Sequence, residues 1–286
     1  MGENPVASFP QPELVREALS SLGCLVVSDV FLSETARLAS VVLPAASFAE
    51  KDGTFTNFEG RVQRVRKAIE PAGESLPDSE IVMRLAGKMD LPIAYSSPQQ
   101  VMEEIKELVP FYRYFEYTNV DTLSLDLNEA GSNTPGTRRL YKGLFPDGFG
   151  RFTPVEYTPP QGINMGKYPF MLMAGSGQYQ FGDGSRSSRS ARLKQFSPEA
   201  FLEINPADAS ENDIGSGDRV TIISAQGELS ARARVMDTLP RGLLFMPISY
   251  PAHPVYGLFS PIIDRRTGAP TLKTCYVMLQ RITGND

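Results

Sequence analysis

The pattern of apolar residues changes near Phe170, and this change constrains the fold more than any other feature of the chain. In the first ninety or so residues, stretches with helical spacing such as 76–89 alternate with short continuous apolar runs such as 24–28. After Phe170, at least six short apolar runs are separated by turn residues. The sequence therefore predicts an α/β part over residues 1–109 and a small closed barrel of six strands over residues 169–286.

The segment between these two parts, residues 110–168, has no sustained period. Glycine, proline, asparagine and aromatic residues are scattered through it, as in the run 131–136. A stretch of this length without regular elements is unusual inside a compact domain. We interpret it as an extended connector that passes over the surface of a partner.

The charge and the apolar runs exclude several classes of protein. The net charge of −5 and the isoelectric point near 5.2 argue against a protein that binds nucleic acid. No apolar run approaches the roughly 18–20 residues that a membrane span requires. Residues 1–5 do not form the basic and then apolar pattern of a signal peptide. We expect a cytoplasmic protein without a membrane span.

The residues that usually carry redox, metal or acyl-transfer chemistry are scarce. The two cysteines, Cys24 and Cys275, are far apart in the sequence, and each stands in an apolar run that predicts a buried free thiol. The single histidine, His253, stands between prolines and has no neighbouring ligand or nucleophile. The sequence therefore predicts neither a catalytic residue nor a metal ligand in this chain.

Two polar loops are the best candidates for a binding site. Residues 43–63 follow a predicted strand, and ligands bind beyond the carboxyl ends of parallel strands in open α/β sheets. Residues 175–189 combine glycines with serines and arginines, which suits a phosphate group. A solvated surface loop is the competing interpretation for the first stretch, and a flexible turn for the second.

Several motifs together resemble the molybdopterin-dinucleotide oxidoreductases. The resemblance is strongest to the catalytic subunits of formate dehydrogenases and to the large iron–sulfur subunit of NADH:quinone oxidoreductases. It covers nearly the whole chain and is weakest in the connector. The motifs are residues 1–5, 26–36, 41–46 and 53–63 in the first half, and 198–201, 204–209, 217–220 and 242–247 in the second half.

The resemblance implies a fold and a ligand. The fold would be an α/β partial molybdopterin-binding domain followed by a six-stranded double-psi β-barrel that binds the dinucleotide. The ligand would be molybdopterin guanine dinucleotide holding Mo or W, shared with a partner chain. By position, the cofactor contacts would be Gly2, Asn4, Ser8, Ser28, Asp29, Ser47 and Asp78 in the first part, and Ser176, Gly177, Gln180 and Gly182 in the barrel.

The chain also departs from the family pattern. Ser176 stands where the family usually has an arginine, and Gln180 to Gly182 stand where a histidine is typical. Losing a cation and an imidazole weakens the binding of an anion, although Arg186 or Arg189 could compensate. The catalytic cysteine or selenocysteine of the family and its cluster-binding cysteines lie upstream of the motif at residues 2–5.

Three readings of the function follow from this resemblance. In the first, the chain completes a cofactor site together with a subunit that carries the amino-terminal iron–sulfur and catalytic half. In the second, it is a structural subunit of an electron-transfer complex like NADH dehydrogenase, with no molybdenum cofactor. In the third, it is a truncated fragment of a full-length enzyme. Other electron-transfer subunits would be its partners in the first two readings.

Overall fold

The computed structural model describes residues 1–57, 61–109, 112, 117, 125–126, 148–150, 152, 154, 166–260, 263, 268 and 272–282. The chain groups into two compact units. One comprises Met1, Glu3–Val42 and Thr158–Asp286, and the other comprises Gly2 and Leu43–Tyr157. Most of the predicted connector lies outside the described residues, so the domain limits at 109 and 168 stay a prediction.

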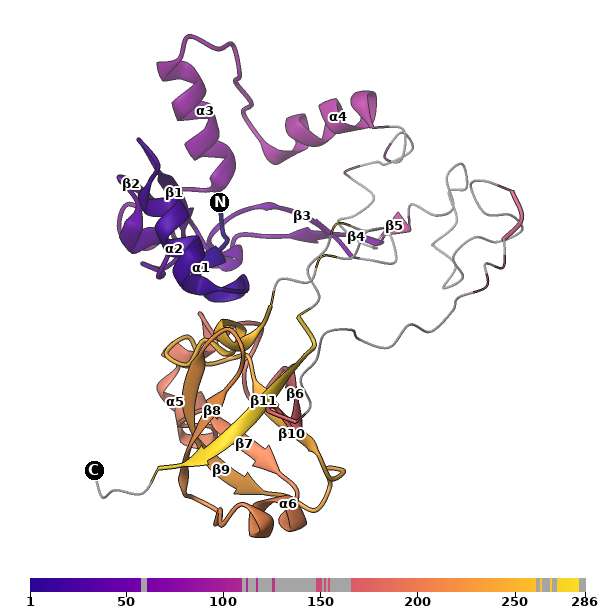
Figure 1. Cartoon of the computed structure of the whole chain (residues 1–286). Coiled ribbons are helices and arrows are strands. Elements are labelled where there is room, and N and C mark those ends of the chain that lie inside the picture. Colours follow the sequence, from indigo (N-terminus) through magenta and orange to yellow (C-terminus); the bar gives the residue numbers. More distant parts are fainter. Residues whose placement is uncertain are drawn as a thin grey trace. The chain divides into compact units, whose positions relative to one another are not determined.

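The first unit contains a closed barrel of six strands, as the sequence predicts (Figure 1). Strands β6 and β10 are parallel neighbours, as are β7 and β9, whereas the other adjacent pairs are antiparallel. Around the barrel the strands are β10 (Leu243–Pro247), β6 (Phe170–Gly175), β11 (Thr274–Arg281), β8 (Arg219–Ile223), β9 (Glu228–Val235) and β7 (Phe201–Ile204).

The interior of the barrel is filled by alternate residues of its strands, because successive side chains of a strand point to opposite faces. On β8, Val220 and Ile222 are fully buried while their neighbours are partly or fully exposed. Leu172, Leu244 and Val277 fill the same core from three other strands. The strands β8 and β9 form a hairpin, since they pair antiparallel up to the turn between them.

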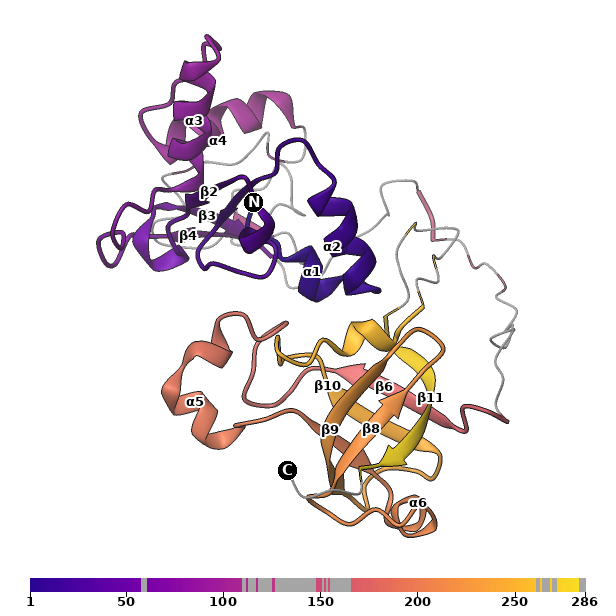
Figure 2. The ribbon, with the colours of Figure 1, turned by 60° about the vertical axis from the view of Figure 1, so that its left-hand side comes forward.

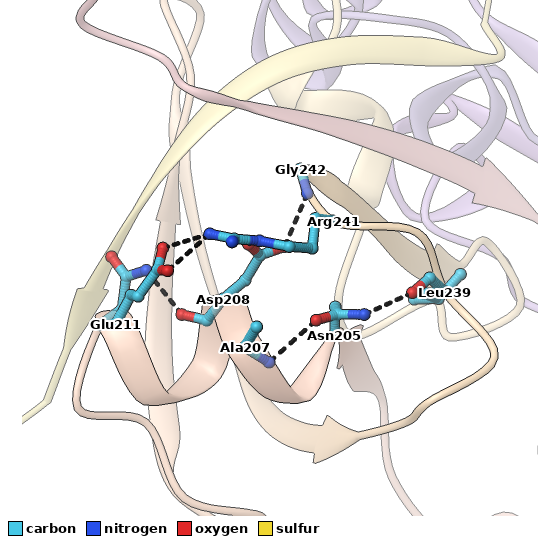
Figure 3. Close-up of polar contacts among 8 residues, drawn as sticks. Asn205, Ala207, Asp208, Glu211, Leu239, Arg241 and Gly242 are labelled. Atoms are coloured by element: carbon cyan, nitrogen blue, oxygen red, sulfur yellow. Dashed lines mark hydrogen bonds and ion pairs between the residues drawn. The ribbon is translucent and has the colours of Figure 1, made fainter.

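A buried carboxylate joins a short helix to the strand β10. Asp208 lies on α6 (Pro206–Glu211) and is 4% exposed. Its carboxylate accepts hydrogen bonds from the Gly242 N–H at 2.6 Å and from the Arg241 Nε at 3.3 Å (Figure 3). Arg241 also binds the carboxylate of Glu211 at 2.6 Å. The motif at 204–209 therefore stabilises the barrel itself.

The residue that begins α6 extends this network. The Asn205 side chain accepts a hydrogen bond from the Ala207 N–H at 2.9 Å and donates one to the Leu239 carbonyl at 2.7 Å (Figure 3). It caps the helix and also fixes the loop that precedes β10. Figures 1 and 2 both show α6 at one end of the barrel, with α5 (Ala191–Phe196) beside the strands.

The amino-terminal part of the first unit is built from short elements. They are α1 (Pro5–Ser8), α2 (Pro12–Ser20), β1 (Val26–Asp29) and the 3-10 turn η1 (Ala36–Leu38). The strand β1 pairs only with β2 (Val41–Pro44) in a two-stranded sheet among the described residues, and Val26 and Val41 are exposed on it.

One prediction about the cysteines is wrong and one is refined. Cys24 is exposed, because β1 begins only at Val26 and the thiol lies in the preceding loop. Cys275 lies on β11 and is partly buried, and this burial raises the pKa of its thiol to about 12. The Cys275 thiol therefore lacks the lowered pKa that a reactive cysteine requires.

The second unit holds a three-stranded antiparallel sheet and two helices. The sheet contains β3 (Gly53–Thr56), β4 (Arg61–Val65) and β5 (Leu125–Asp126), and Val62 and Met102 lie in its small core. The stretch 43–63, expected as one polar loop, thus contains a β-hairpin around residues 58–60, which lie outside the described residues. The helices are α3 (Asp78–Lys88) and α4 (Pro98–Leu108).

The chain also contains the short 3-10 turns η2 (Phe48–Glu50), η6 (Ser187–Arg189) and η7 (Val255–Leu258). Among the described residues, no helix combines the length and the apolar character needed to cross a membrane.

The Asp208 network gives a first prediction. Asp208→Ala should lower the free energy of unfolding by about 2–3 kcal/mol, because it leaves the Gly242 N–H without its partner and removes a charged acceptor from Arg241. Glu211→Ala is the matched control, since it removes an exposed partner of the same arginine and should cost about 1 kcal/mol or less. Urea unfolding followed by circular dichroism measures both. Equal losses for the two variants would contradict the role assigned to Asp208.

Candidate functional site

The loop after β6, residues 176–189, is a series of hydrogen-bonded turns and is called the barrel loop below. The Gln180 N–H donates to the Gly177 carbonyl at 3.2 Å, and the Gly184 N–H donates to the Phe181 carbonyl at 3.0 Å. The Phe181 N–H donates to the Ser187 hydroxyl at 3.1 Å. This arrangement gives defined positions to all four predicted cofactor residues of the barrel, of which Ser176 and Gly182 are exposed and Gly177 and Gln180 partly buried.

Two buried polar atoms at predicted cofactor positions have no hydrogen-bond partner in the part of the chain that the structure describes. They are the Ser28 hydroxyl, on β1 with the residue 3% exposed, and the Gln180 Oε1 in the barrel loop. A buried polar group without a partner costs about 1–3 kcal/mol, so native proteins keep few of them. Both atoms therefore have the character expected of groups that await a ligand.

The predicted residues Asn4 and Ser8 make internal contacts. The Asn4 Oδ1 accepts hydrogen bonds from the Thr35 hydroxyl at 2.8 Å and the Thr35 N–H at 3.1 Å, and its Nδ2 donates to Glu34 at 2.8 Å. The Ser8 hydroxyl donates to the Asn4 carbonyl at 3.1 Å. These bonds fasten the amino-terminal turn to the segment after β1, and they account for the burial of Asn4.

Asp29 ends β1 and borders a cavity of about 450 Å³ within the first unit. Its carboxylate accepts hydrogen bonds from the Val30 N–H at 2.7 Å and the Ser33 hydroxyl at 2.9 Å. The residues that line the cavity are Asp29, Phe31, Ser33, Glu34, Ser185, Ser188, Arg189, Lys194, Pro198, Glu199, Ala200, Tyr250, Pro251, Ala252 and His253.

The cavity offers both signs of charge. Carboxylates come from Asp29, Glu34 and Glu199, and cations from Arg189 and Lys194. The Arg189 guanidinium lies 4.5 Å from the centroid of the Phe31 ring, a cation–π contact that joins the barrel loop to the segment after β1. This lining suits a ligand with hydrogen-bond donors at one end and an anionic group at the other.

In the second unit, Asp78 and Ser47 are also bonded internally. Asp78 is the first residue of α3 and forms an ion pair with Lys51. The Ser47 N–H donates to the Glu50 carboxylate at 2.7 Å, and the same carboxylate accepts a bond from the Ala72 N–H at 2.9 Å. Glu50 is a residue that the sequence analysis missed, although the Ser47-x-x-Glu50 spacing is the signature of a helix capping box.

Gly2 is exposed and has a φ of +66°, in the left-handed region that favours glycine. It belongs to the second unit, together with Ser47 and Asp78, whereas the other eight predicted cofactor residues belong to the first.

The capping carboxylate gives a prediction about pH. The backbone N–H of Ser47 holds the pKa of Glu50 below its ordinary value of 4.5, with a further contribution from the Ser47 side chain. A carboxyl whose pKa is lowered by folding stabilises the folded state above its unfolded pKa, and this contribution is lost as the pH falls through the folded pKa.

Glu50→Gln should therefore destabilise the chain at pH 7 and have a progressively smaller effect as the pH falls below about 4.5. Urea midpoints of the wild type and the variant across this range measure the difference. Glu74→Gln, an exposed carboxyl nearby, is the charge-matched control. A penalty for Glu50→Gln that stays constant with pH would contradict the role of the carboxylate.

The family model for molybdopterin oxidoreductase matches residues 1–88, and the model for the molybdopterin dinucleotide binding domain matches residues 170–276. The F420-dependent formate dehydrogenase subunit alpha of Methanocaldococcus jannaschii is 40% identical over 286 residues, covering 99% of this chain and 42% of that protein.

Two further matches differ in function from that relative. An NADH-quinone oxidoreductase subunit of Rhizobium meliloti is 33% identical over 252 residues, covering 88% of this chain and 27% of that protein. The solved structure of acetylene hydratase from Pelobacter acetylenicus has a TM-score of 0.77 at 18% identity, covering 99% of this chain and 44% of that one. This likeness shows a shared fold. The chain spans about two fifths of the length of the formate dehydrogenase relative.

Proposed function

This chain belongs to the molybdopterin oxidoreductase family, and we propose that it supplies cofactor-binding surface to a formate dehydrogenase-like enzyme whose redox residues lie outside these 286 residues. The observation that carries the proposal is the pair of buried, unpartnered polar atoms at Ser28 and Gln180, both at positions where the family resemblance places the cofactor. Iron–sulfur and other electron-transfer subunits would be its partners.

The donor set fits a molybdopterin guanine dinucleotide. The edge of a guanine presents N–H donors, for which the carboxylates of Asp29 and Glu34 are suitable acceptors. A pyrophosphate is matched by the cations Arg189 and Lys194, and the Gln180 Oε1 can accept a hydrogen bond from the pterin or nucleoside. Arg189 would thus compensate for the cation missing at Ser176.

The proposed division of labour follows from this chemistry. When bound, the cofactor supplies a Mo or W centre for electron transfer, while the protein binds and orients it. Among the described residues, no cluster of His, Cys, Asp and Glu could hold a metal ion. We assign binding and orientation to Ser28, Asp29, Gln180 and Arg189 and, following the family resemblance, ligation of the metal to a partner chain.

A second candidate function is a structural subunit without the cofactor. It is favoured by the internal bonds of Asn4, Asp29 and Asp78, whose side chains are occupied by other residues of this chain. The similarity to the NADH-quinone oxidoreductase subunit of Rhizobium meliloti supports the same candidate. A fragment of a longer enzyme would have the same cofactor-binding surface as the proposed subunit. Binding experiments therefore cannot distinguish the fragment from the subunit, whereas the structure of the gene can.

The composition of the assembled protein tests these candidates. The chain is purified with its native partners, and its Mo and W content is measured by plasma mass spectrometry. Guanine nucleotide is released by acid and quantified by chromatography. We expect close to stoichiometric metal and guanine. A folded complex that lacks both would contradict the proposed function and favour the structural subunit.

Removing the Ser28 hydroxyl should have opposite effects on the stability of the chain and on the retention of the guanine nucleotide. In the chain alone, Ser28→Ala should leave the free energy of unfolding unchanged or raise it by about 1 kcal/mol, because it removes a buried group without a partner. In the assembled protein, the same change should weaken retention of the guanine nucleotide about 5-fold, as expected for a lost hydrogen bond worth about 1 kcal/mol.

Ser224→Ala is the matched control for this prediction. Ser224 is also buried, but its hydroxyl accepts hydrogen bonds from the Gln226 and Gly227 N–H groups at 3.0 and 3.2 Å. Its replacement should destabilise the chain and leave the guanine content unchanged. Destabilisation by Ser28→Ala equal to that of the control would show that Ser28 already has a partner in this chain.

A further inference from the structure

Ser249 touches the barrel loop at two points although it lies more than sixty residues further along the chain. It follows β10 and is fully buried. Its hydroxyl donates to the Gly182 carbonyl at 2.9 Å and lies 3.5 Å from the Gly177 N–H, which donates to it in a long hydrogen bond. Gly177 and Gly182 are the two ends of the segment that carries Gln180, so one hydroxyl bridges both ends.

The backbone of Ser249 makes a third contact with the same loop. Gly184 has a φ of +82°, and a Cβ built on it would lie 2.0 Å from the Ser249 carbonyl oxygen. Only glycine allows this approach, because any side chain would need both a strained backbone and the space taken by that oxygen. Hydrogen bonds and steric contact thus hold the loop against one residue.

The parallel pairing of two strands explains why these residues meet. In the register of β6 and β10, Gly175 is the partner of Pro247, and the Ile248 N–H donates to the Gly175 carbonyl at 2.9 Å. Parallel neighbours leave the barrel at the same end. The loop after β6 and the segment after β10 therefore begin side by side.

The contact with Ser249 restrains the loop that carries the unpartnered acceptor of Gln180. A glutamine on an unrestrained loop would turn its amide towards water, since a buried acceptor without a partner is unfavourable. The loop around Gln180 is fixed at both ends, and the Gln180 Oε1 remains buried without a partner among the described residues.

We propose that Ser249 is a positioning residue that holds the Gly177–Gly182 segment so that the buried Gln180 amide oxygen is kept ready for a ligand donor. The inference rests on the proposed function for the identity of that ligand, a molybdopterin guanine dinucleotide. The next residue, Tyr250, bonds through its hydroxyl to Ser197 and lines the cavity beside Arg189. Ser249 therefore lies between the barrel loop and the cavity wall.

Hydrogen exchange of the full chain tests the restraint on the loop without any cofactor. Ser249→Ala should speed exchange of the Gln180, Phe181 and Gly184 amides at least about 5-fold, the factor expected from a lost bond of about 1 kcal/mol. Gly184→Ala should give the same local pattern. Ser224→Ala, a buried serine of the β8–β9 turn, should leave these amides unchanged. Faster exchange spread evenly over the barrel in Ser249→Ala would overturn the proposal.

A double-mutant cycle tests the link to Gln180. In the wild-type background, Gln180→Ala should raise the urea midpoint, because it removes an acceptor that is buried without a partner. In the Ser249→Ala background the released glutamine can already reach water, so the same change should produce no rise. Equal shifts in the two backgrounds would overturn the proposal.

Retention of the guanine nucleotide by the assembled protein separates this inference from the proposed function. We expect Ser249→Ala to weaken retention about 5-fold and Ser224→Ala to leave it unchanged. Guanine absent from the wild-type complex defeats the proposed function, while the exchange pattern and the cycle still decide whether Ser249 holds the loop. Guanine present and equally retained in Ser249→Ala would overturn the positioning role.

Discussion

The parallel pairing of β6 with β10 is the constraint on which the candidate site depends. It closes the barrel between β7 and β11. It also places the carboxyl ends of two strands that are about seventy residues apart at the same end of the barrel. Because the core residues of both strands are buried, the carboxyl ends of β6 and β10 occupy defined positions. The glycine-rich loop and the Ser249 segment can then bind each other, and the cavity wall at Tyr250 continues from the same segment.

The polar residues of the family motifs divide into two groups with different physical roles. Asp208, Asn205 and Asn4 are engaged by other residues of this chain and stabilise its fold. Ser28 and Gln180 each keep a polar atom without a partner among the described residues, at a cost that folding alone does not explain. Asp29 stands between these groups, since Ser33 and Val30 bind its carboxylate although it borders the cavity. A ligand that used Asp29 would have to displace the Ser33 hydroxyl or share the acceptor with it.

Much of the barrel could be predicted from the sequence, because inward residues such as Val220 and Ile222 alternate with outward ones and glycine-containing turns separate the strands. The β3–β4 hairpin was missed, since polar side chains dominate residues 53–63 and, among the described residues of this stretch, only Val62 lies in the core. The order of the strands around the barrel depends on pairing between distant segments, which local patterns cannot specify.

The candidate site was predicted unevenly for the same reason. The family resemblance gives each cofactor position separately. The contacts that decide the role of each of these residues come from residues far away in the chain. Asp78 was expected to contact the cofactor, and its ion pair with Lys51 appears only in the folded unit. Ser249 stands in an unremarkable run, and its importance comes from burial and from the approach of Gly184. Glu50, by contrast, carried a local signal in its spacing from Ser47.

The two-stranded sheet of β1 and β2 has a consequence for anyone who produces this chain. A pair of strands alone is marginally stable in water, and here it exposes Val26 and Val41. Unpaired strand edges with apolar side chains associate readily with one another. Yield from a cell should therefore depend on whether a covering surface is synthesised at the same time. Under the proposed function, co-expression with the catalytic partner chain is the rational first choice for obtaining monodisperse material.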